Sequence, residues 1–292
     1  MALIQLREVS KVYGFGEATT LALDEVDLSV KKGEFVAVMG PSGSGKTTLL
    51  NVIGLLDRPT HGEYRLGGKP AARLRPNRQA RLRRDQIGFI FQSYNLIPRL
   101  NVLENVALPL AYSGITPVKR WHAASDILER VGLRDREYFL PRHLSSGQAQ
   151  RAAVARALIK KPGIIIADES TGNLDSFDSK VVMELFADIH RQGNTILLVT
   201  HNPELTRYAS RVIYMYDGAI VGDESTAIGS LARGARRVYF GRHRRSAEDI
   251  TAGVSALMHE IPGKEITDKP KPRRAAKRKK SVRKTRRKVS AR

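Results

Sequence analysis

The sequence predicts an α/β fold with a mainly parallel core sheet, an antiparallel β-subdomain at the N-terminus and an inserted helical subdomain. Short apolar runs typical of buried strands, such as Ile164–Ala167 and Ile196–Val199, alternate with segments of helical spacing, which favours a parallel sheet. Two segments with period-two apolar residues come first, Ile4–Val9 and Leu21–Val30, as expected of antiparallel strands. A long block of helical spacing, from about residue 95 to 160, indicates a separate helical lobe.

The other elements follow from the spacing of apolar residues and from turn residues. Pro117 opens a helix, as proline does at a first helical position, and Asp217-Gly218 predicts the turn of a closing hairpin. The further expected elements are the strand Glu34–Met39, the helix Lys46–Leu56, the strand Ile87–Phe91, two helices between Asn101 and Val131, the helix Gly147–Lys160, the strand Gly163–Ala167, the helix Asp178–Arg191, the strand Thr195–Thr200 and the hairpin strands Val212–Tyr216 and Ala219–Val221.

The composition is that of a globular protein. The 292 residues suffice for one large α/β domain or two small ones, and the 41% hydrophobic and 27% charged residues are ordinary values. No apolar run approaches the roughly 18 to 20 residues that span a bilayer, and Met1–Ser10 lacks the layout of a secretory signal. The absence of cysteine excludes disulfides and thiolate chemistry. We therefore expect a soluble, cytoplasmic protein.

Positive charge is concentrated at the C-terminal end of the chain. The net charge is +21, and residues 264–292 contain 15 Lys or Arg against two acids. This tail is nearly free of large apolar residues, so it cannot bury enough surface to fold alone. We expect three regions: a folded domain over 1–224, a linker over 225–263 in which Ala247–Ile261 has weak helical spacing, and a disordered polybasic tail over 264–292.

Three interpretations of this tail stay open: a solvated segment without a specific partner, a segment that binds anionic lipid head groups, and one that binds nucleic acid. Each basic residue near an anionic membrane contributes around 1 kcal/mol, whereas Ala, Pro and Lys together are also typical of histone-like tails.

Another basic cluster is expected to be a solvated exposed face. It consists of Arg73, Arg75, Arg78, Arg81, Arg83 and Arg84.

A glycine-rich segment lies between the strand Glu34–Met39 and the helix after it. It matches the pattern G-x-x-x-x-G-K-[ST], which in this context forms a phosphate-binding loop. Glycines let backbone N–H groups converge on phosphate oxygens, assisted by the positive end of the helix. We expect Lys46 to reach the β- and γ-phosphates of a nucleotide and the Thr47 hydroxyl to ligate Mg²⁺. The loop consists of Gly40, Pro41, Ser42, Gly43, Ser44, Gly45, Lys46, Thr47 and Thr48.

Two acids, Asp168 and Glu169, follow the apolar run Ile164–Ala167. A buried strand of a parallel sheet delivers residues at its carboxyl end to the edge where the phosphate loop lies. Asp168 is there expected to hold Mg²⁺ through water, and Glu169 to polarise the attacking water. An apolar strand ending in acids is commonplace by itself, and it is the phosphate loop that makes the catalytic interpretation the better one.

The segment Leu144-Ser145-Ser146-Gly147-Gln148 opens a helix about twenty residues before the acid pair. With it, the sequence resembles the ABC (ATP-binding cassette) ATPase family, a branch of the P-loop NTPases whose signature segment is LSGGQ. The resemblance extends from Ile4 to about Asp223. Four further residues fall at positions of family motifs: Tyr13 where an aromatic stacks on adenine, Gln92 in the Q-loop, Asp175 in the D-loop and His201 as the switch histidine.

The resemblance implies ATP hydrolysis with Mg²⁺ by two copies that pair head to tail and enclose two ATP molecules. Each phosphate loop then faces the partner's signature segment, where Ser145, Ser146, Gly147 and Gln148 contact nucleotide. Gln92 is implied to sense Mg²⁺ and to couple to a membrane subunit. His201 is implied to hydrogen-bond the γ-phosphate, and Asp175 to bridge the two sites.

A finer resemblance concerns the stretch from Phe91 to Pro109 and Thr171–Asp175. It looks like the branch that serves macrolide exporters and lipoprotein-releasing complexes. This implies a transport subunit of the cell envelope that powers separate integral membrane permease subunits and lies peripherally on the inner face of the membrane. The alternative is a soluble, non-transport ABC ATPase, or a regulatory module, that acts on nucleic acid through its basic tail.

Two residues depart from the family pattern. Ser146 stands where the first glycine of LSGGQ is usual, and a left-handed backbone there would make a side chain costly. Ser170 replaces the usual proline after the acid pair, which is expected to loosen that turn.

Overall fold

The computed structural model describes residues 2–15 and 18–225. The chain divides into two units, Met1–Pro262 and Gly263–Arg292, and every described residue belongs to the first. The predicted linker helix Ala247–Ile261 and the tail over 264–292 lie outside the described residues, so the predicted domain boundaries stay predictions.

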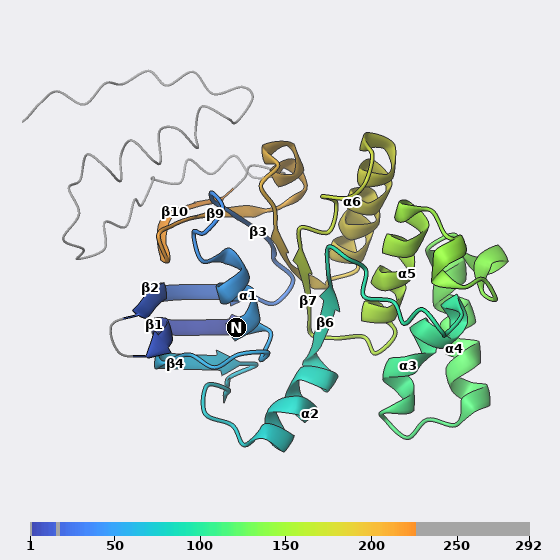
Figure 1. The fold of residues 1–292 in the computed structure, drawn as a ribbon, viewed down its shortest axis with the longest axis horizontal. Coiled ribbons are helices and arrows are strands. Elements are labelled where there is room, and N and C mark those ends of the chain that lie inside the picture. Colours follow the sequence, from blue (N-terminus) through green and yellow to red (C-terminus); the bar gives the residue numbers. More distant parts are fainter. Residues whose placement is uncertain (1, 16–17, 226–292) are drawn as a thin grey trace, which may run out of the picture. The chain divides into compact units, whose positions relative to one another are not determined.

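The described strands form two sheets (Figure 1). The four-stranded sheet has the order β2-β1-β4-β5 and is antiparallel. The six-stranded sheet has the order β10-β9-β3-β8-β7-β6, with only the β9–β10 hairpin antiparallel. The strands are β1 Ala2–Phe15, β2 Ala18–Lys31, β3 Phe35–Met39, β4 His61–Leu66, β5 Lys69–Pro70, β6 Ile87–Ile90, β7 Ile164–Asp168, β8 Thr195–Val199, β9 Arg211–Tyr216 and β10 Ala219–Ser225.

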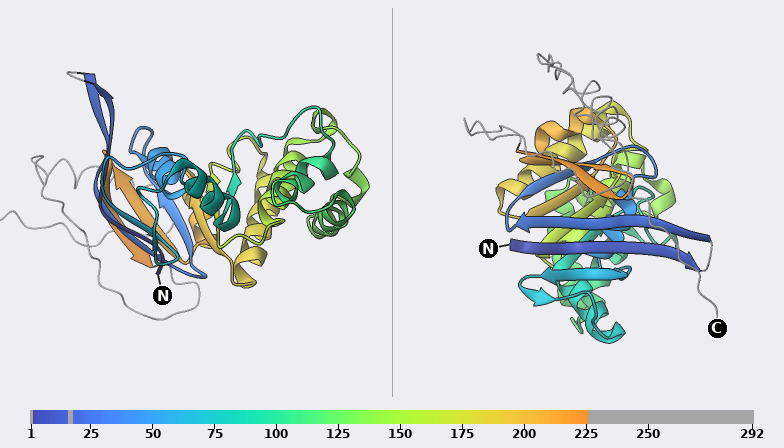
Figure 2. Two further views of the ribbon diagram at one scale, coloured as in Figure 1. Left: turned by 90° about the horizontal axis from the view of Figure 1, so that it is seen from below. Right: turned by 90° about the vertical axis from the view of Figure 1, so that its left-hand side faces the viewer.

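The helices α3, α4 and α5 gather at one side of the six-stranded sheet, and the antiparallel sheet lies at the other (Figures 1 and 2). This arrangement confirms the predicted fold class, including its helical lobe. The α-helices are α1 Lys46–Ile53, α2 Pro76–Gln86, α3 Val102–Ala111, α4 Pro117–Arg130, α5 Ser146–Leu158 and α6 Ser176–Arg191, and the 3₁₀-helices are η1 Arg134–Arg136, η2 Pro141–His143 and η3 Pro203–Tyr208.

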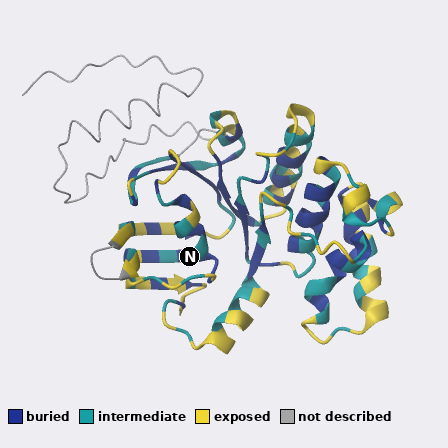
Figure 3. Ribbon diagram, viewed as in Figure 1, coloured by how far each residue is buried: buried dark blue, intermediate teal, exposed yellow. Residues whose placement is uncertain are grey.

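The parallel strands are buried on both faces. Because successive residues of a strand point to opposite sides, each strand contributes to two apolar clusters. Val36 and Val38 of β3 face one apolar cluster together with the antiparallel sheet and α1. Phe35 and Ala37 face a second cluster that includes Phe186 of α6. A third cluster holds the helical lobe together, and Figure 3 shows the buried residues running through the central sheet. This layered core places the carboxyl ends of β3, β7 and β8 at one edge.

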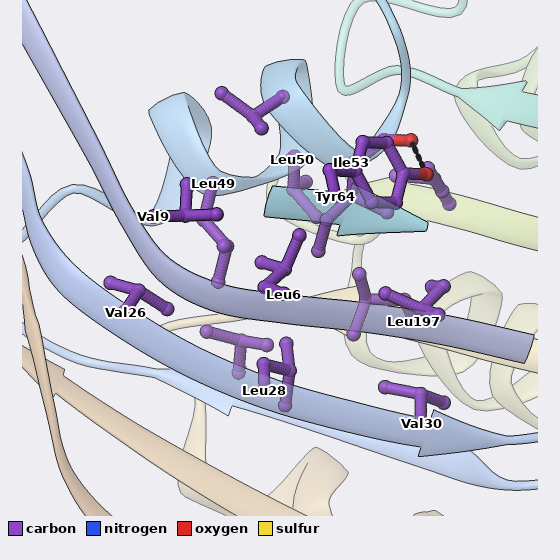
Figure 4. Packing of buried hydrophobic residues seen from close by; sticks show 14 of the residues in the cluster. Leu6, Val9, Val26, Leu28, Val30, Leu49, Leu50, Ile53, Tyr64 and Leu197 are labelled. Atoms are coloured by element: carbon purple, nitrogen blue, oxygen red, sulfur yellow. Dashed lines mark hydrogen bonds between the residues drawn. The ribbon is translucent and has the colours of Figure 1, made fainter. Parts of the chain in front are cut away.

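The first cluster joins the antiparallel sheet to the helix that follows the phosphate loop (Figure 4). Leu6 of β1 and Leu49 of α1 are buried in it. The buried Tyr64 of β4 packs there and donates a hydrogen bond from its hydroxyl to the Ile53 carbonyl at 2.6 Å. The end of α1 is therefore anchored by both apolar contact and a buried hydrogen bond.

One predicted helix ends earlier in the structure, and one α-helix and two strands of the structure were not predicted. The helix predicted over Lys46–Leu56 ends at Ile53, because Leu55 takes a left-handed φ of 57°. Helix α2 was not predicted, because it buries no residue and has no apolar stripe. Arg83 and Gln79 instead donate hydrogen bonds to the Leu55 carbonyl.

Helix α2 carries four of the six residues of the arginine cluster. Five of the six arginines are exposed, as predicted, and Arg83 is half-buried. Strands β4 and β5 were also not predicted, since β4 carries only two apolar side chains, Tyr64 and Leu66. Long-range pairing of β4 with β1 determines them.

Candidate functional site

The phosphate loop leaves the buried strand β3 and turns into α1. Gly45, the residue before α1, has a left-handed φ of 94°. The Ser44 N–H donates to the Pro41 carbonyl at 3.2 Å, and the Gly218 N–H donates to the Ser44 carbonyl at 3.1 Å. Gly218 belongs to the predicted Asp217-Gly218 turn of the β9–β10 hairpin, which therefore braces the loop.

Two glycines of the loop differ in what surrounds them. Gly45 approaches β2 so closely that a Cβ would lie 2.5 Å from the Ala22 carbonyl oxygen. Gly43 has a similar φ of 81°, but no atom lies within 4 Å of the place a Cβ would take. The first position therefore needs glycine for space and conformation, and the second for conformation alone.

This contrast gives a matched pair of variants. We expect Gly43→Ala to destabilise the protein by about 1 kcal/mol from backbone strain, and Gly45→Ala by about 2 kcal/mol or more beyond that, because β2 must shift. Thermal unfolding without nucleotide measures both. Equal losses in the two variants would show that the approach to Ala22 does not matter.

Lys46 folds back over its own loop. Its ammonium donates hydrogen bonds to the carbonyls of Gly40 at 2.8 Å and Pro41 at 2.7 Å. The side chain is buried, and burial lowers the pKa of the ammonium although the carboxylates of Glu169 and Asp168 oppose this. The ammonium also donates to the Ser44 Oγ at 3.5 Å, and a cation that is removed from water and bonded to these uncharged oxygens is favourably placed to receive an anion.

The two acids lie where β7 ends beside β8. Burial, and next the charge of Glu169, raise the pKa of the Asp168 carboxyl, while Lys46 opposes this rise. Glu169 has a left-handed φ of 44°, an uncommon conformation for a residue with a side chain and one that is found at functional sites. Its N–H donates to the Val199 carbonyl of β8 at 3.0 Å. The turn is thus held against the neighbouring strand.

His201 follows β8 and meets the second acid. Its Nδ1 lies 3.3 Å from the Glu169 Oε1. The histidine side chain is exposed, whereas the Glu169 side chain is only 29% exposed. The parallel pairing of β7 with β8 brings these two residues together, although 32 positions separate them in the sequence.

One cavity of about 720 Å³ joins most of the predicted site residues. The phosphate loop forms one wall, and Glu169 and His201 also line the cavity. Residues Thr20 to Ala22 of β2, Met39 of β3 and Tyr216 of β9 complete it. Sequence reasoning missed these last residues, because no local pattern predicts which side chains a distant strand contributes to the cavity.

The signature segment does not line this cavity. It begins α5, where Ser145 and Gln148 form a capping box: the Gln148 N–H donates to the Ser145 Oγ at 3.2 Å, and the Ser145 N–H donates to the Gln148 Oε1 at 3.0 Å. Ser145 and Ser146 are exposed and Gly147 is buried. A Cβ at Gly147 would lie within 2.1–2.3 Å of the Asp178 carboxyl group, so any side chain at this position would displace the Asp178 side chain.

The strain that a left-handed backbone would cause at Ser146 is absent. Ser146 is the first residue of α5 and does not have a positive φ, so a left-handed backbone does not penalise its side chain. The other departure, Ser170, is buried, and its hydroxyl has no hydrogen-bond partner within the described part of the chain.

Gln92 and Asp175 do not line the cavity. The Asn173 side chain donates to the Gln92 carbonyl at 3.2 Å, and a Cβ at Gly172 would lie 3.0 Å from the Gln92 Nε2. The Q-loop therefore contacts the segment that follows Glu169. Asp175 caps α6 by accepting the Asp178 N–H at 2.7 Å.

Tyr13 also does not line the cavity. The residue is 40% exposed, and its hydroxyl donates to the Asp57 Oδ2 at 2.8 Å. On strand β1 it pairs with Thr20 of β2, a cavity residue. The tyrosine therefore borders the site.

Comparisons with known proteins agree with this geometry. The profile of the ABC transporter family matches residues 23–172. The ABC transporter ATP-binding protein YvrO of Bacillus subtilis is 44% identical over 222 residues, which cover 76% of this chain and 97% of YvrO. The macrolide export ATP-binding/permease protein MacB of Marinobacter nauticus is 46% identical over 221 residues, which cover 76% of this chain and 34% of MacB.

A solved structure is similar over the same extent. The dimeric, post-hydrolysis state of the ATP-binding cassette MJ0796 bound to ADP and Pi has a TM-score of 0.71 and 41% identity, covering 76% of this chain and 98% of that one. The chain therefore belongs to the family of ABC transporter ATP-binding proteins, and it is an ATPase. Among the described residues, no helix combines the length and the apolar character needed to cross a bilayer.

Proposed function

We propose that this chain powers an ABC transport complex of the cell envelope, of the macrolide-export or lipoprotein-release type. The observation that carries the proposal is the cavity lined by every residue of the phosphate loop except Ser44, together with Glu169 and His201. The identity to MacB supports macrolide export over lipoprotein release.

The cavity residues suit phosphoryl transfer to water. Loop N–H groups and the start of α1 bind the phosphates of ATP, and Lys46 exchanges the Gly40 and Pro41 carbonyls for phosphate oxygens. Glu169, close to His201, accepts the proton of the attacking water, and His201 donates a hydrogen bond to the γ-phosphate. In this proposal the negative charges of ATP, four in all, balance the positive charge of the buried Lys46 ammonium.

The residues also fit Mg²⁺. The described residues contain no group of three or more His, Cys, Asp or Glu side chains able to hold a metal alone, and Mg²⁺ is usually bound by one or two carboxylates plus substrate phosphates. The Thr47 hydroxyl, the Asp168 carboxylate and the Gln92 amide oxygen are hard oxygen ligands. Burial and the neighbouring charge of Glu169 raise the pKa of the Asp168 carboxyl, and a cation bound beside it would favour its charged form. Bound Mg²⁺ would neutralise charge on the phosphates.

A second copy of the chain completes the site in this proposal. The exposed Ser145 and Ser146 stand at the start of α5, outside the cavity of their own chain, and a helix start attracts phosphate. Head-to-tail pairing would bring them, with Gly147 and Gln148, to the partner's ATP and would place Asp175 between the two sites. The dimeric MJ0796 structure supports this arrangement.

A groove of about 710 Å³ suits a membrane subunit. Its lining includes Phe89 and Phe91, whose ring centroids stack at 5.4 Å, and the basic residues Arg84 and Lys160. Gln92 follows Phe91 directly, so a partner seated here would touch the segment that leads to the nucleotide. The permease part of MacB supports a membrane partner. We place the complex at the cytoplasmic face of the membrane, with this chain peripheral to it.

Purification of the tagged chain from detergent-solubilised membranes of its own organism tests the proposed function. We expect an integral membrane subunit to co-purify, and ATP hydrolysis to be faster in that complex than in the isolated chain. Recovery of the chain only with nucleic acid, without a membrane protein, would favour the alternative of a non-transport ATPase.

A further inference from the structure

Three side chains form a closed cluster at the border of the cavity. The Lys11 ammonium donates to the Asp57 Oδ1 at 2.7 Å, and the Tyr13 hydroxyl donates to the Asp57 Oδ2 at 2.8 Å. Lys11 also lies over the Tyr13 ring, with its Nζ 4.7 Å from the ring centroid. Each residue thus contacts the other two. We call Lys11 and Asp57 the tyrosine clamp.

The backbone around Lys11 and Asp57 positions the two side chains of the clamp. Lys11 lies between two register shifts in the pairing of β1 with β2, and such irregularities re-aim side chains. Its side chain is only 13% exposed, and its ammonium also donates to the Arg58 carbonyl at 2.9 Å. Asp57 accepts the Arg58 N–H at 2.6 Å as well. These bonds hold the clamp independently of Tyr13.

The electrostatics of Asp57 are consistent with a firm anchor. Burial alone would raise the pKa of this carboxyl, but the hydrogen bonds from Lys11 and Tyr13 outweigh burial and lower the pKa. The Asp57 carboxylate is thus stabilised in its charged form, which accepts stronger hydrogen bonds than a neutral group. Lys11 balances its charge.

Tyr13 lies on the face of the β1–β2 hairpin that borders the cavity. It pairs directly with Thr20, and the side chains of paired residues in antiparallel strands point to the same face. Thr20 lines the cavity, and so does Thr48, whose hydroxyl interacts with that of Tyr13. Because Lys11 occupies one face of the ring, a planar group can stack only on the other.

We infer that Lys11 and Asp57 are positioning residues that hold Tyr13 as a one-sided platform for the nucleotide base. The inference rests on the proposed ATP-binding function and on the contact of Tyr13 with adenine that the family resemblance implies. An exposed aromatic side chain that is held in advance loses less conformational freedom on binding, so the clamp should increase affinity for nucleotides through the base and not through the phosphates.

Two probes separate base from phosphate: MgADP and Mg-tripolyphosphate, which lacks a base. Calorimetry on the full chain measures both dissociation constants. We expect Tyr13→Ala to weaken MgADP about tenfold and Asp57→Ala about fivefold, with tripolyphosphate unchanged in both. Asp85→Ala is the matched control, because Asp85 also joins two cations, Arg84 and Lys160, but does not line the cavity. It should change neither constant.

The double variant Tyr13→Ala/Asp57→Ala tests whether Asp57 acts through Tyr13. When Tyr13 is absent, we expect the Asp57 change to weaken MgADP binding by less than about a further twofold, since the effects of coupled residues are not additive. Lys11→Met is a second way to open the clamp and should reproduce the selective loss of MgADP affinity if Asp57→Ala folds poorly.

Equal weakening of MgADP and tripolyphosphate by Asp57→Ala, or a full fivefold loss that persists without Tyr13, would overturn the inference. An unchanged MgADP constant in Tyr13→Ala would overturn the base contact itself and the clamp with it. Neither outcome affects the proposed ATPase site, which Lys46 variants test separately.

Discussion

Glu169→Gln is expected to reduce the rate of ATP hydrolysis about 10²- to 10⁴-fold, the usual contribution of a general base. Glutamine keeps the size of the side chain and its position beside His201 but cannot accept a proton. Because the change leaves the phosphate loop intact, ATP binding should persist. Two copies with ATP bound should then accumulate as a dimer that size-exclusion chromatography detects.

The matched control for this variant is Glu204→Gln, which removes an exposed acid close to His201 in sequence that does not line the cavity. It should hydrolyse ATP at the wild-type rate. If Glu169→Gln turned over ATP as fast as wild type, the assignment of the base would be wrong. A slow variant that also failed to bind ATP would indicate damage to the site instead.

Lys46→Ala has the second large expected effect, a loss of nucleotide affinity of about tenfold to 100-fold, the size of a charged hydrogen bond. The ammonium is buried against the Gly40 and Pro41 carbonyls, so its removal takes away the only lysine among the residues that line the cavity. Binding of MgADP and of Mg-tripolyphosphate should weaken together, because this contact concerns phosphate.

Lys46→Met separates charge from volume, since methionine retains an apolar stem of similar length. It should bind as weakly as Lys46→Ala, whereas the exposed Lys32→Ala should bind normally. Recovery of affinity in Lys46→Met would mean that packing, and not the ammonium, supports the loop.

Local patterns predicted most of the fold. The strands Phe35–Met39, Ile164–Asp168 and Thr195–Val199 were expected within two residues of their ends, because buried parallel strands are continuous apolar runs whose signal needs no partner. Helix α2 and strand β4 gave no such signal, since hydrogen bonds to Leu55 and pairing with β1 determine them.

The candidate site likewise contains some residues that could be predicted from the sequence and others that could not. The phosphate loop, Asp168 and Glu169 could be predicted together, because the carboxyl ends of neighbouring parallel strands meet at one edge of the sheet. Their roles stay predictions. Sequence reasoning could not assign a conformation to Ser146, since the capping box of Ser145 and Gln148 selects helical rather than left-handed backbone there.

The sequence by itself determined the fold class, the family and the identity of the residues expected to bind phosphate, because periodicity and motif spacing are properties of short segments. Only the tertiary structure decided what surrounds them: the Thr20 and Tyr216 walls, the Glu169–His201 contact and the clamp of Lys11 and Asp57 on Tyr13. Asp57 lies 44 positions from Tyr13. Contacts over such separations depend on how the sheets and helices pack, and no local pattern in the chain encodes them.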